Sequence, residues 1–138
     1  MVGPMSRWFR NLLIIELAVI AAVTVIFKII PTRLYAGAMA GTLFVALGVW
    51  IVISGVRDRQ VRRSASFALG AIHLFVISLP MMLIRFLNAS SAFADVRIFG
   101  LAGPAFHQLS SVVYLLLIVA TLVDWYRFRK SEVSQAGS

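Results

Sequence analysis

Four polar side chains, Glu16, His73, Thr121 and Asp124, lie inside stretches of the chain that are otherwise apolar. A carboxylate inside a membrane-spanning helix costs about 2.5–3.5 kcal/mol on insertion scales, so such a residue usually has a partner or a function. A glutamate and a histidine in apolar surroundings can share a proton and titrate near neutral pH. These four residues are therefore candidates for a proton or ion site.

The depth of these side chains can be counted from the helix ends. At 1.5 Å per residue, Glu16, His73 and Thr121 fall roughly 8–11 Å below the inner membrane boundary, and Asp124 lies about one turn shallower. Two other interpretations of Glu16 stay open: a buried hydrogen bond that fixes helix register, or a pair with a basic residue of a partner protein. Asp124 has a simpler alternative, an interfacial ion pair with Arg127 three residues later.

The stretches that carry these residues are long enough to cross a bilayer, which takes ~20 apolar residues of helix. Of the 138 residues, 61% are hydrophobic and 13% are charged, which leaves too little polar sequence to cover a soluble core. We predict an all-α integral membrane protein, with four transmembrane helices in an antiparallel up-down bundle. The single four-helix transmembrane domain covers residues 1–138, with spans at about 10–30, 34–56, 65–86 and 108–126 and a polar tail at 127–138.

The segments between the spans carry turn and kink signals. Pro31 ends the first helix, and Pro80 predicts a kink inside the third. The longest connection, residues 88–107, contains an apolar stretch from Ile98 to Phe106 that is broken by glycine and proline. We expect this stretch to dip into the outer interface or to cap the bundle. The polar tail is expected to be frayed.

Basic residues predict the orientation. The chain has 13 lysines and arginines, of which nine fall on one side of the predicted membrane and four on the other. The positive-inside rule then places both termini in the cytoplasm of a cell with an inner (plasma) membrane, where anionic lipid headgroups are the expected partners. The nine are Arg7, Arg10, Arg57, Arg59, Arg62, Arg63, Arg127, Arg129 and Lys130, and the four are Lys28, Arg33, Arg85 and Arg97.

Four glycines of the second span, Gly37, Gly41, Gly48 and Gly55, are spaced by four, seven and seven residues. These steps keep them on one helical stripe, where a neighbouring backbone can come close. The stripe predicts helix packing, either within this chain or in a homo-oligomer or a complex with another membrane protein.

We expect no cofactor, no metal site and no nucleic-acid partner. The sequence has no cysteine, and His73 and His107 are separated by roughly 20 Å of helical rise, which disfavours one haem held by both. Met81 and Met82 could bind copper(I), but methionine also fills gaps beside kinks. The basic residues flank apolar spans instead of forming a soluble basic face, which disfavours nucleic acid.

These observations favour a non-enzymatic function, since no hydrolytic or transfer motif is present. The expectation is a small multi-pass inner-membrane protein that serves as an accessory or assembly subunit of a larger membrane complex. The alternative is a small proton- or ion-coupled transporter that acts as an oligomer around Glu16 and His73. A third possibility is a redox subunit that shares a haem with a partner chain.

Overall fold

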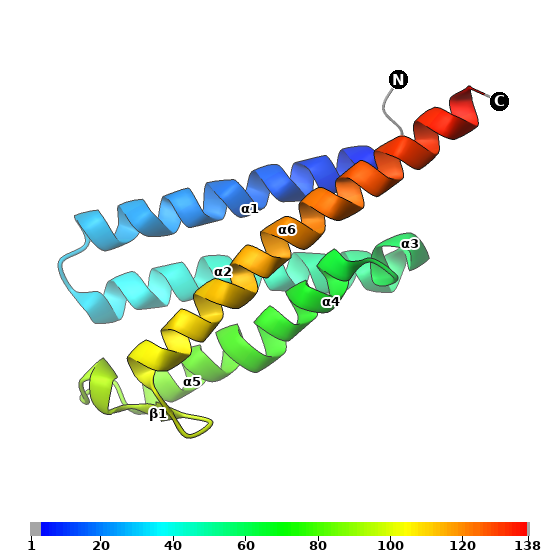
Figure 1. The fold of residues 1–138 in the computed structure, drawn as a ribbon. Helices are drawn as coiled ribbons and strands as arrows, with labels where there is room; N and C mark the ends of the chain where they lie inside the picture. The colour runs from blue at the N-terminus through cyan, green and yellow to red at the C-terminus, as the bar shows by residue number, and fades with distance from the viewer. Residues whose placement is uncertain (1–3, 138) are drawn as a thin grey trace.

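The computed structural model describes residues 4–137, which form a helical bundle with one small hairpin (Figure 1). The elements in chain order are α1 (Pro4–Ile29), α2 (Arg33–Arg57), α3 (Arg59–Arg62), α4 (Ala65–Ile72), the π-helix η1 (His73–Ser78), α5 (Leu79–Leu87), the 3₁₀ helix η2 (Phe93–Asp95), β1 (Arg97–Ile98), β2 (Leu101–Ala102) and α6 (Gly103–Ala136).

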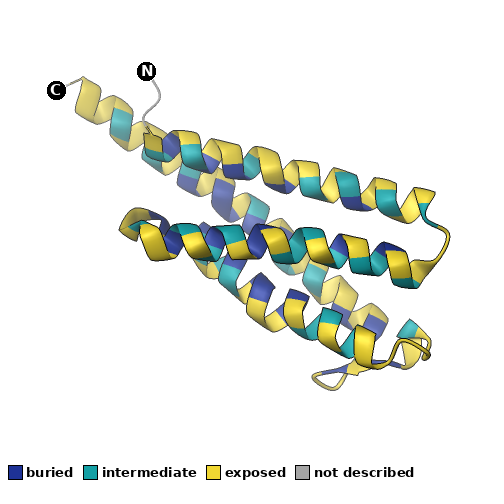
Figure 2. Ribbon diagram, turned by 180° about the vertical axis from the view of Figure 1, so that it is seen from behind, coloured by how far each residue is buried: buried dark blue, intermediate teal, exposed yellow. Residues whose placement is uncertain are grey.

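Within residues 4–137, four helical segments are long and apolar enough to cross a membrane. They are α1, α2, the continuous run from Ala65 to Leu87, and α6, and they cover the four predicted spans. Much of each of these helices is exposed (Figure 2), and the exposed residues include many Leu, Ile, Val and Phe. A surface of this kind is stable against lipid, whereas large exposed apolar patches are unusual on soluble monomers.

α6 runs obliquely across the bundle and packs against the first and third spans (Figure 1). It contacts α1 along one side and α4 and η1 along the other, and α2 packs between α1 and the third span. Both described ends of the chain and α3 lie at one end of the bundle, while the α1–α2 turn and the hairpin lie at the opposite end (Figure 1). The chain thus separates its predicted inner and outer segments between the two ends.

Two apolar clusters form the core. The larger one joins α1, α2 and α6, with Phe9, Leu12, Ile51 and Leu117 almost fully enclosed. The smaller one lies under the hairpin and consists of Ile77, Val96, Ile98 and Phe106.

The third span is irregular directly before the proline at which the sequence predicts a kink. Pro80 lies in the first turn of α5, directly after η1, and the Leu79 N–H donates to the carbonyl of Leu74, five residues earlier. Proline has no N–H to give to the carbonyl four residues before it, and single π turns are a common way for helices to absorb such a defect. The irregularity is therefore a widened turn ahead of Pro80.

The long connection caps the bundle with a hairpin. β1 and β2 pair in antiparallel fashion through a two-residue loop, Phe99 and Gly100, and both loop residues have positive φ, as a type I′ turn requires. Ile98 is 0% exposed because it packs against the span ends in the smaller cluster. The expectation that this apolar stretch packs over the bundle is confirmed, although its two short strands were not predicted.

The polar tail is helical, so the prediction that it frays is wrong. α6 continues to Ala136, about three turns beyond the expected end of the fourth span. The Phe128 ring stacks on Phe9 at 5.0 Å between ring centres, and the Glu132 carboxylate accepts hydrogen bonds from the backbone N–H and the hydroxyl of Ser6. These contacts with α1 order the last turns, and they also explain why α1 begins at Pro4 instead of near residue 10.

Candidate functional site

Glu16 lies on the buried face of α1, in line with Phe9, Leu12 and Val23. Its side chain is 0% exposed and points into the bundle, toward α6. The Thr121 hydroxyl lies 2.7 Å from Oε1, while Oε2 is buried without a hydrogen-bond partner among the residues that the structure describes. A carboxyl group thus occupies a position that an apolar side chain would fill in an ordinary packing face.

The two contacts of the Thr121 hydroxyl indicate whether the Glu16 carboxyl carries a proton. It lies 2.7 Å from Glu16 Oε1 and 2.9 Å from the carbonyl of Leu117, yet it has one hydrogen to donate. With a protonated Glu16, the carboxyl donates to Thr121 and Thr121 donates to Leu117, so both contacts are hydrogen bonds. With an ionised Glu16, one of the two contacts has no hydrogen. The geometry therefore suits a carboxyl group that holds its proton.

Tyr114 joins Glu16 to the third span. Its hydroxyl donates to the backbone carbonyl of Glu16, and its ring lies edge-on to the rings of His73 and Phe44, with centres 5.5 and 5.1 Å away. Tyr114, Thr121 and Asp124 follow one another at steps of seven and three residues, which place them on one face of α6. Tyr114 was not among the predicted site residues, although this spacing could have marked it.

His73 opens the π turn and is 4% exposed. Its Nδ1 lies 3.0 Å from the hydroxyl of Ser78, and its Nε2 is buried without a partner among the described residues. Residues five apart face different directions in an α-helix, whereas the π turn, with its i→i+5 bonding, brings them together. Ser78 could not be found from α-helical spacing for this reason. Whichever ring nitrogen carries the hydrogen, Nε2 remains available to gain or lose a proton.

Glu16 and His73 do not bond to each other. Glu16 uses Oε1 for Thr121, His73 uses Nδ1 for Ser78, and the remaining oxygen and nitrogen are both unpartnered. The directly paired glutamate and histidine envisaged from the sequence are therefore replaced by two separate groups that both contact Tyr114.

Asp124 is 2% exposed, and its partner is Ser66 instead of the expected Arg127. Its Oδ2 accepts hydrogen bonds from the backbone N–H of Ser66 at 2.9 Å and from the Ser66 hydroxyl at 2.6 Å. A carboxylate at the start of α4 also interacts favourably with the helix dipole. The surface ion pair with Arg127 does not form, because Asp124 faces the bundle interior. Glu132 binds Ser6 at the start of α1 through the same pair of groups.

Three of the four glycines face the third span. A Cβ at Gly48 would come within 2.8 Å of the Leu74 Cβ, a Cβ at Gly41 would meet the Met82 side chain, and one at Gly55 would meet the Phe67 ring. These three glycines of the stripe therefore pack against another helix of the same chain. Gly37 differs, since nothing lies within 4 Å of a Cβ placed there.

The titratable groups of the site are not arranged as ligands of a metal ion or a haem. Among the described residues, no group of three or more His, Asp or Glu side chains could hold a metal ion. His107 is exposed at the start of α6, whereas His73 is enclosed in the bundle, so the fold does not bring the two histidines together. The groups that remain are a buried carboxyl, a buried imidazole and a tyrosine hydroxyl.

The fold and the site define a class of protein: a helical bundle of four apolar segments with a buried polar cluster at its centre. Comparisons with protein-family models, with curated proteins and with solved structures give no match for this chain.

Proposed function

We propose that this chain is a small multi-pass inner-membrane protein that carries protons through the polar cluster around Glu16 and His73, as a proton-coupled transporter does. The observation that supports this proposal best is that two buried atoms, Glu16 Oε2 and His73 Nε2, have no hydrogen-bond partner among the described residues. Both atoms belong to residues that contact Tyr114. Leaving a buried polar atom without a partner costs about 1–3 kcal/mol. Two such costs in one cluster are readily understood if both atoms exchange protons.

A proton fits the cluster better than a metal cation. Hard cations take six or more oxygen ligands, and even one that keeps several waters needs charged oxygens directed at a common point. Here one carboxylate oxygen faces a hydroxyl, and the carbonyl of Glu16 already accepts from Tyr114. A proton needs no such shell, since it moves between single pairs of atoms.

The proposed setting is the cell inner membrane, with the four spans running up and down and both termini in the cytoplasm. The apolar exterior supports insertion into a bilayer. The nine basic residues of the predicted inner side belong to segments at the end of the bundle that carries the two termini and α3 (Figure 1). Anionic headgroups of the inner leaflet would be their partners.

The test is proton flux into vesicles. Purified protein is reconstituted into phosphatidylcholine–phosphatidylglycerol vesicles that contain a pH-sensitive dye, and a pH gradient is imposed. Glu16→Gln keeps the shape of the side chain and removes its acidity, so flux should fall by on the order of 100-fold, as loss of a proton-transfer group typically causes. Asp95→Asn, at an exposed carboxylate in η2, is the matched control. Equal flux through wild type and Glu16→Gln would contradict the proposal.

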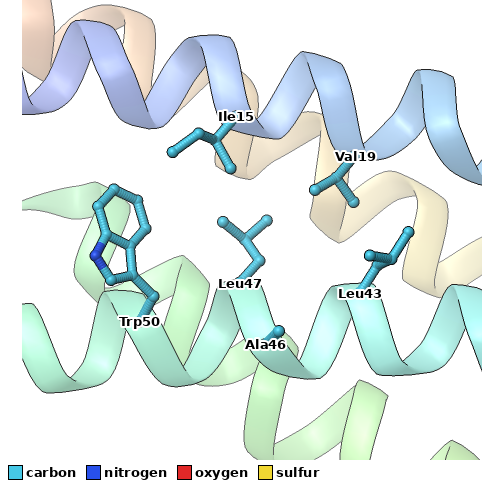
Figure 3. A pocket seen from close by; sticks show the side chains of 6 residues that line it. All are labelled: Ile15, Val19, Leu43, Ala46, Leu47 and Trp50. Carbon is cyan, nitrogen blue, oxygen red and sulfur yellow. The ribbon is translucent and has the colours of Figure 1, made fainter.

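A second candidate is a non-enzymatic accessory or assembly subunit of a larger membrane complex. The observation in its favour is an apolar groove of about 390 Å³ between α1 and α2 (Figure 3). The side chains that line it are Ile15, Val19, Leu43, Ala46, Leu47 and Trp50. A groove of this shape and chemistry suits an apolar side chain from a partner's transmembrane helix.

Co-purification tests the second candidate. Ala46→Phe fills the groove, and Ala21→Phe places the same side chain on an exposed part of α1. An accessory subunit should lose its membrane-protein partner with Ala46→Phe and keep it with Ala21→Phe. Equal recovery of the partner with both variants would count against this role for the groove.

A further inference from the structure

The proton path of the proposed function has a gap at its centre. Among the described residues, Glu16 and His73 each have one polar atom without a hydrogen-bond partner, and no hydrogen bond joins the two side chains. The aromatic rings of Tyr114 and Phe44 pack against the His73 ring. Phe44 has no exchangeable proton, so Tyr114 supplies the polar group through which the two sites could communicate.

The hydroxyl of Tyr114 is held away from both proton-exchanging groups in this structure. It donates its hydrogen bond to the backbone carbonyl of Glu16, a group that does not titrate. That carbonyl belongs to the same residue as the carboxyl group, and a relay requires the Tyr114 side chain to rotate so that its hydroxyl moves from the carbonyl to the carboxyl. The same ring already packs in a T-shaped arrangement with the His73 ring, with ring centres 5.5 Å apart.

We propose that Tyr114 is the relay residue between Glu16 and His73, and that its bond to the Glu16 carbonyl is the disconnected state of the relay. This inference rests on the proposed proton-carrying function. When the hydroxyl leaves the carbonyl, it bridges the Glu16 carboxyl and Nε2 of His73. Its return to the carbonyl interrupts the path.

The transfer balances in atoms and charge. The carboxyl group of Glu16 first turns its O–H, which faces Thr121 in this structure, toward the Tyr114 oxygen. That O–H bond then breaks, and the hydrogen passes to the Tyr114 oxygen. The hydrogen of Tyr114 passes at the same time to Nε2 of His73 in the tautomer that carries its hydrogen on Nδ1. Tyr114 ends unchanged, Glu16 is a carboxylate and His73 is an imidazolium whose Nδ1–H donates to Ser78. A second proton taken up by Glu16 and release of one from His73 restore the starting state.

The test uses Tyr114→Phe, which keeps the ring and removes the hydroxyl. Tyr126→Phe is the matched control, since Tyr126 is on the same helix and 65% exposed. Proton flux into dye-loaded vesicles should fall to the level of Glu16→Gln for Tyr114→Phe and stay at the wild-type level for Tyr126→Phe. Wild-type flux through Tyr114→Phe, with flux still lost in Glu16→Gln, would overturn the relay and leave the proposed function intact. Flux that is unchanged in Glu16→Gln would overturn both.

A second measurement separates a relay from a purely structural role. The infrared carboxyl band of protonated Glu16 can be assigned by its loss in Glu16→Gln. Because Tyr114 bonds to the backbone and Thr121 bonds to the carboxyl, the band should keep its frequency in Tyr114→Phe while flux is lost. A displaced band accompanied by lower thermal stability would show that Tyr114 only holds the helices together, and would overturn the relay.

A chemical variant covers the case in which Tyr114→Phe does not fold. Incorporation of 3-fluorotyrosine at position 114 keeps the hydroxyl and makes it more acidic. A relay residue should respond with a changed rate of flux in a folded protein. An unchanged rate would overturn the proposal, because a hydroxyl that takes part in transfer cannot be indifferent to its own acidity.

Discussion

At the residue scale, the state of Glu16 depends on single hydrogens. The carboxyl group is enclosed in α1, and its polar neighbour Thr121 also reaches the carbonyl of Leu117. Removing one member of such a group leaves the other buried and unsatisfied, which costs more than the bond itself contributes. The role of Thr121 can therefore be measured through stability, without reference to any transport activity.

Thr121→Val should destabilise the folded protein by about 1–3 kcal/mol, since it leaves Glu16 Oε1 without its partner. Thr24→Val is the control, because Thr24 likewise bonds to the carbonyl four residues before it, that of Ile20, but on an exposed surface of α1. We expect its effect to stay within about 0.5 kcal/mol. Thermal unfolding in mild detergent measures both variants. Equal losses in the two variants would mean that the Thr121–Glu16 contact contributes nothing.

The glycines of α2 offer a second comparison at this scale. Gly48→Ala should destabilise the protein by about 1–3 kcal/mol, because the new Cβ would meet the Leu74 Cβ, which cannot move without its helix. Gly37→Ala meets open space and should be neutral or stabilising by up to roughly 1 kcal/mol, the gain in helix propensity. Their melting temperatures in detergent should shift in this order, and the reverse order would place Gly37 at the close contact.

At the scale of elements, α6 organises the end of the bundle that carries both termini. Two of its carboxylates, Asp124 and Glu132, each bind the hydroxyl and the backbone N–H of a serine near the start of another helix. Those helices are α4 and α1, which lie against α6. One long helix thus caps two others and fixes their axial positions, which in turn fixes the level of His73 and Glu16 inside the bundle.

A double-mutant cycle tests this capping. Asp124→Ala and Ser66→Ala should each destabilise the protein, and their combined effect should fall short of additivity by about 1–3 kcal/mol because they break the same contact. A control cycle pairs Ser66→Ala with Asp58→Ala, whose carboxylate caps α3. Its coupling should stay below about 0.5 kcal/mol. Additive effects for the Asp124 and Ser66 pair would show that this contact does not hold α4.

At the scale of the whole molecule, the bundle has two chemically different ends. Its 34-residue helix α6 is about 51 Å long at 1.5 Å per residue, which exceeds a bilayer core of ~30 Å. The excess lies in its last turns, where Arg127, Arg129 and Lys130 are exposed. In the proposed orientation these turns project into the cytoplasm beside the inner leaflet.

Reporter fusions measure this orientation. Fusions at Arg59 and at Gln135 should report a cytoplasmic location, and a fusion at Ala94 should report an external one, because most basic residues belong to the segments around the first two sites. The two cytoplasmic sites serve as controls for each other. A cytoplasmic signal at Ala94 would contradict the orientation with both termini inside.

The sequence by itself determined the four apolar segments of residues 4–137 that are long enough to cross a membrane and the polar residues within them, although α1 and α6 extend beyond the predicted ends. These are local properties, since a run of apolar residues is long enough to cross a bilayer whatever its neighbours are. The glycine spacing also predicted a packing stripe in the second span, and three of its four members face the third span. Glu16, His73 and Thr121 were named as buried polar residues, whereas Tyr114 was not. The sequence could not predict the helical tail, which depends on contacts of Glu132 and Phe128 with α1.

Only the tertiary structure decided which polar atoms meet. In a helix of a soluble protein, the apolar face marks the buried side. Here the outer surface is apolar as well as the core. The pattern of apolar residues therefore does not predict the rotation of each helix about its axis. That rotation is set by packing all four spans together. It placed Tyr114 between Glu16 and His73 and turned Asp124 toward Ser66. The π turn that joins His73 to Ser78 likewise arises from a break in helical spacing that no regular period predicts.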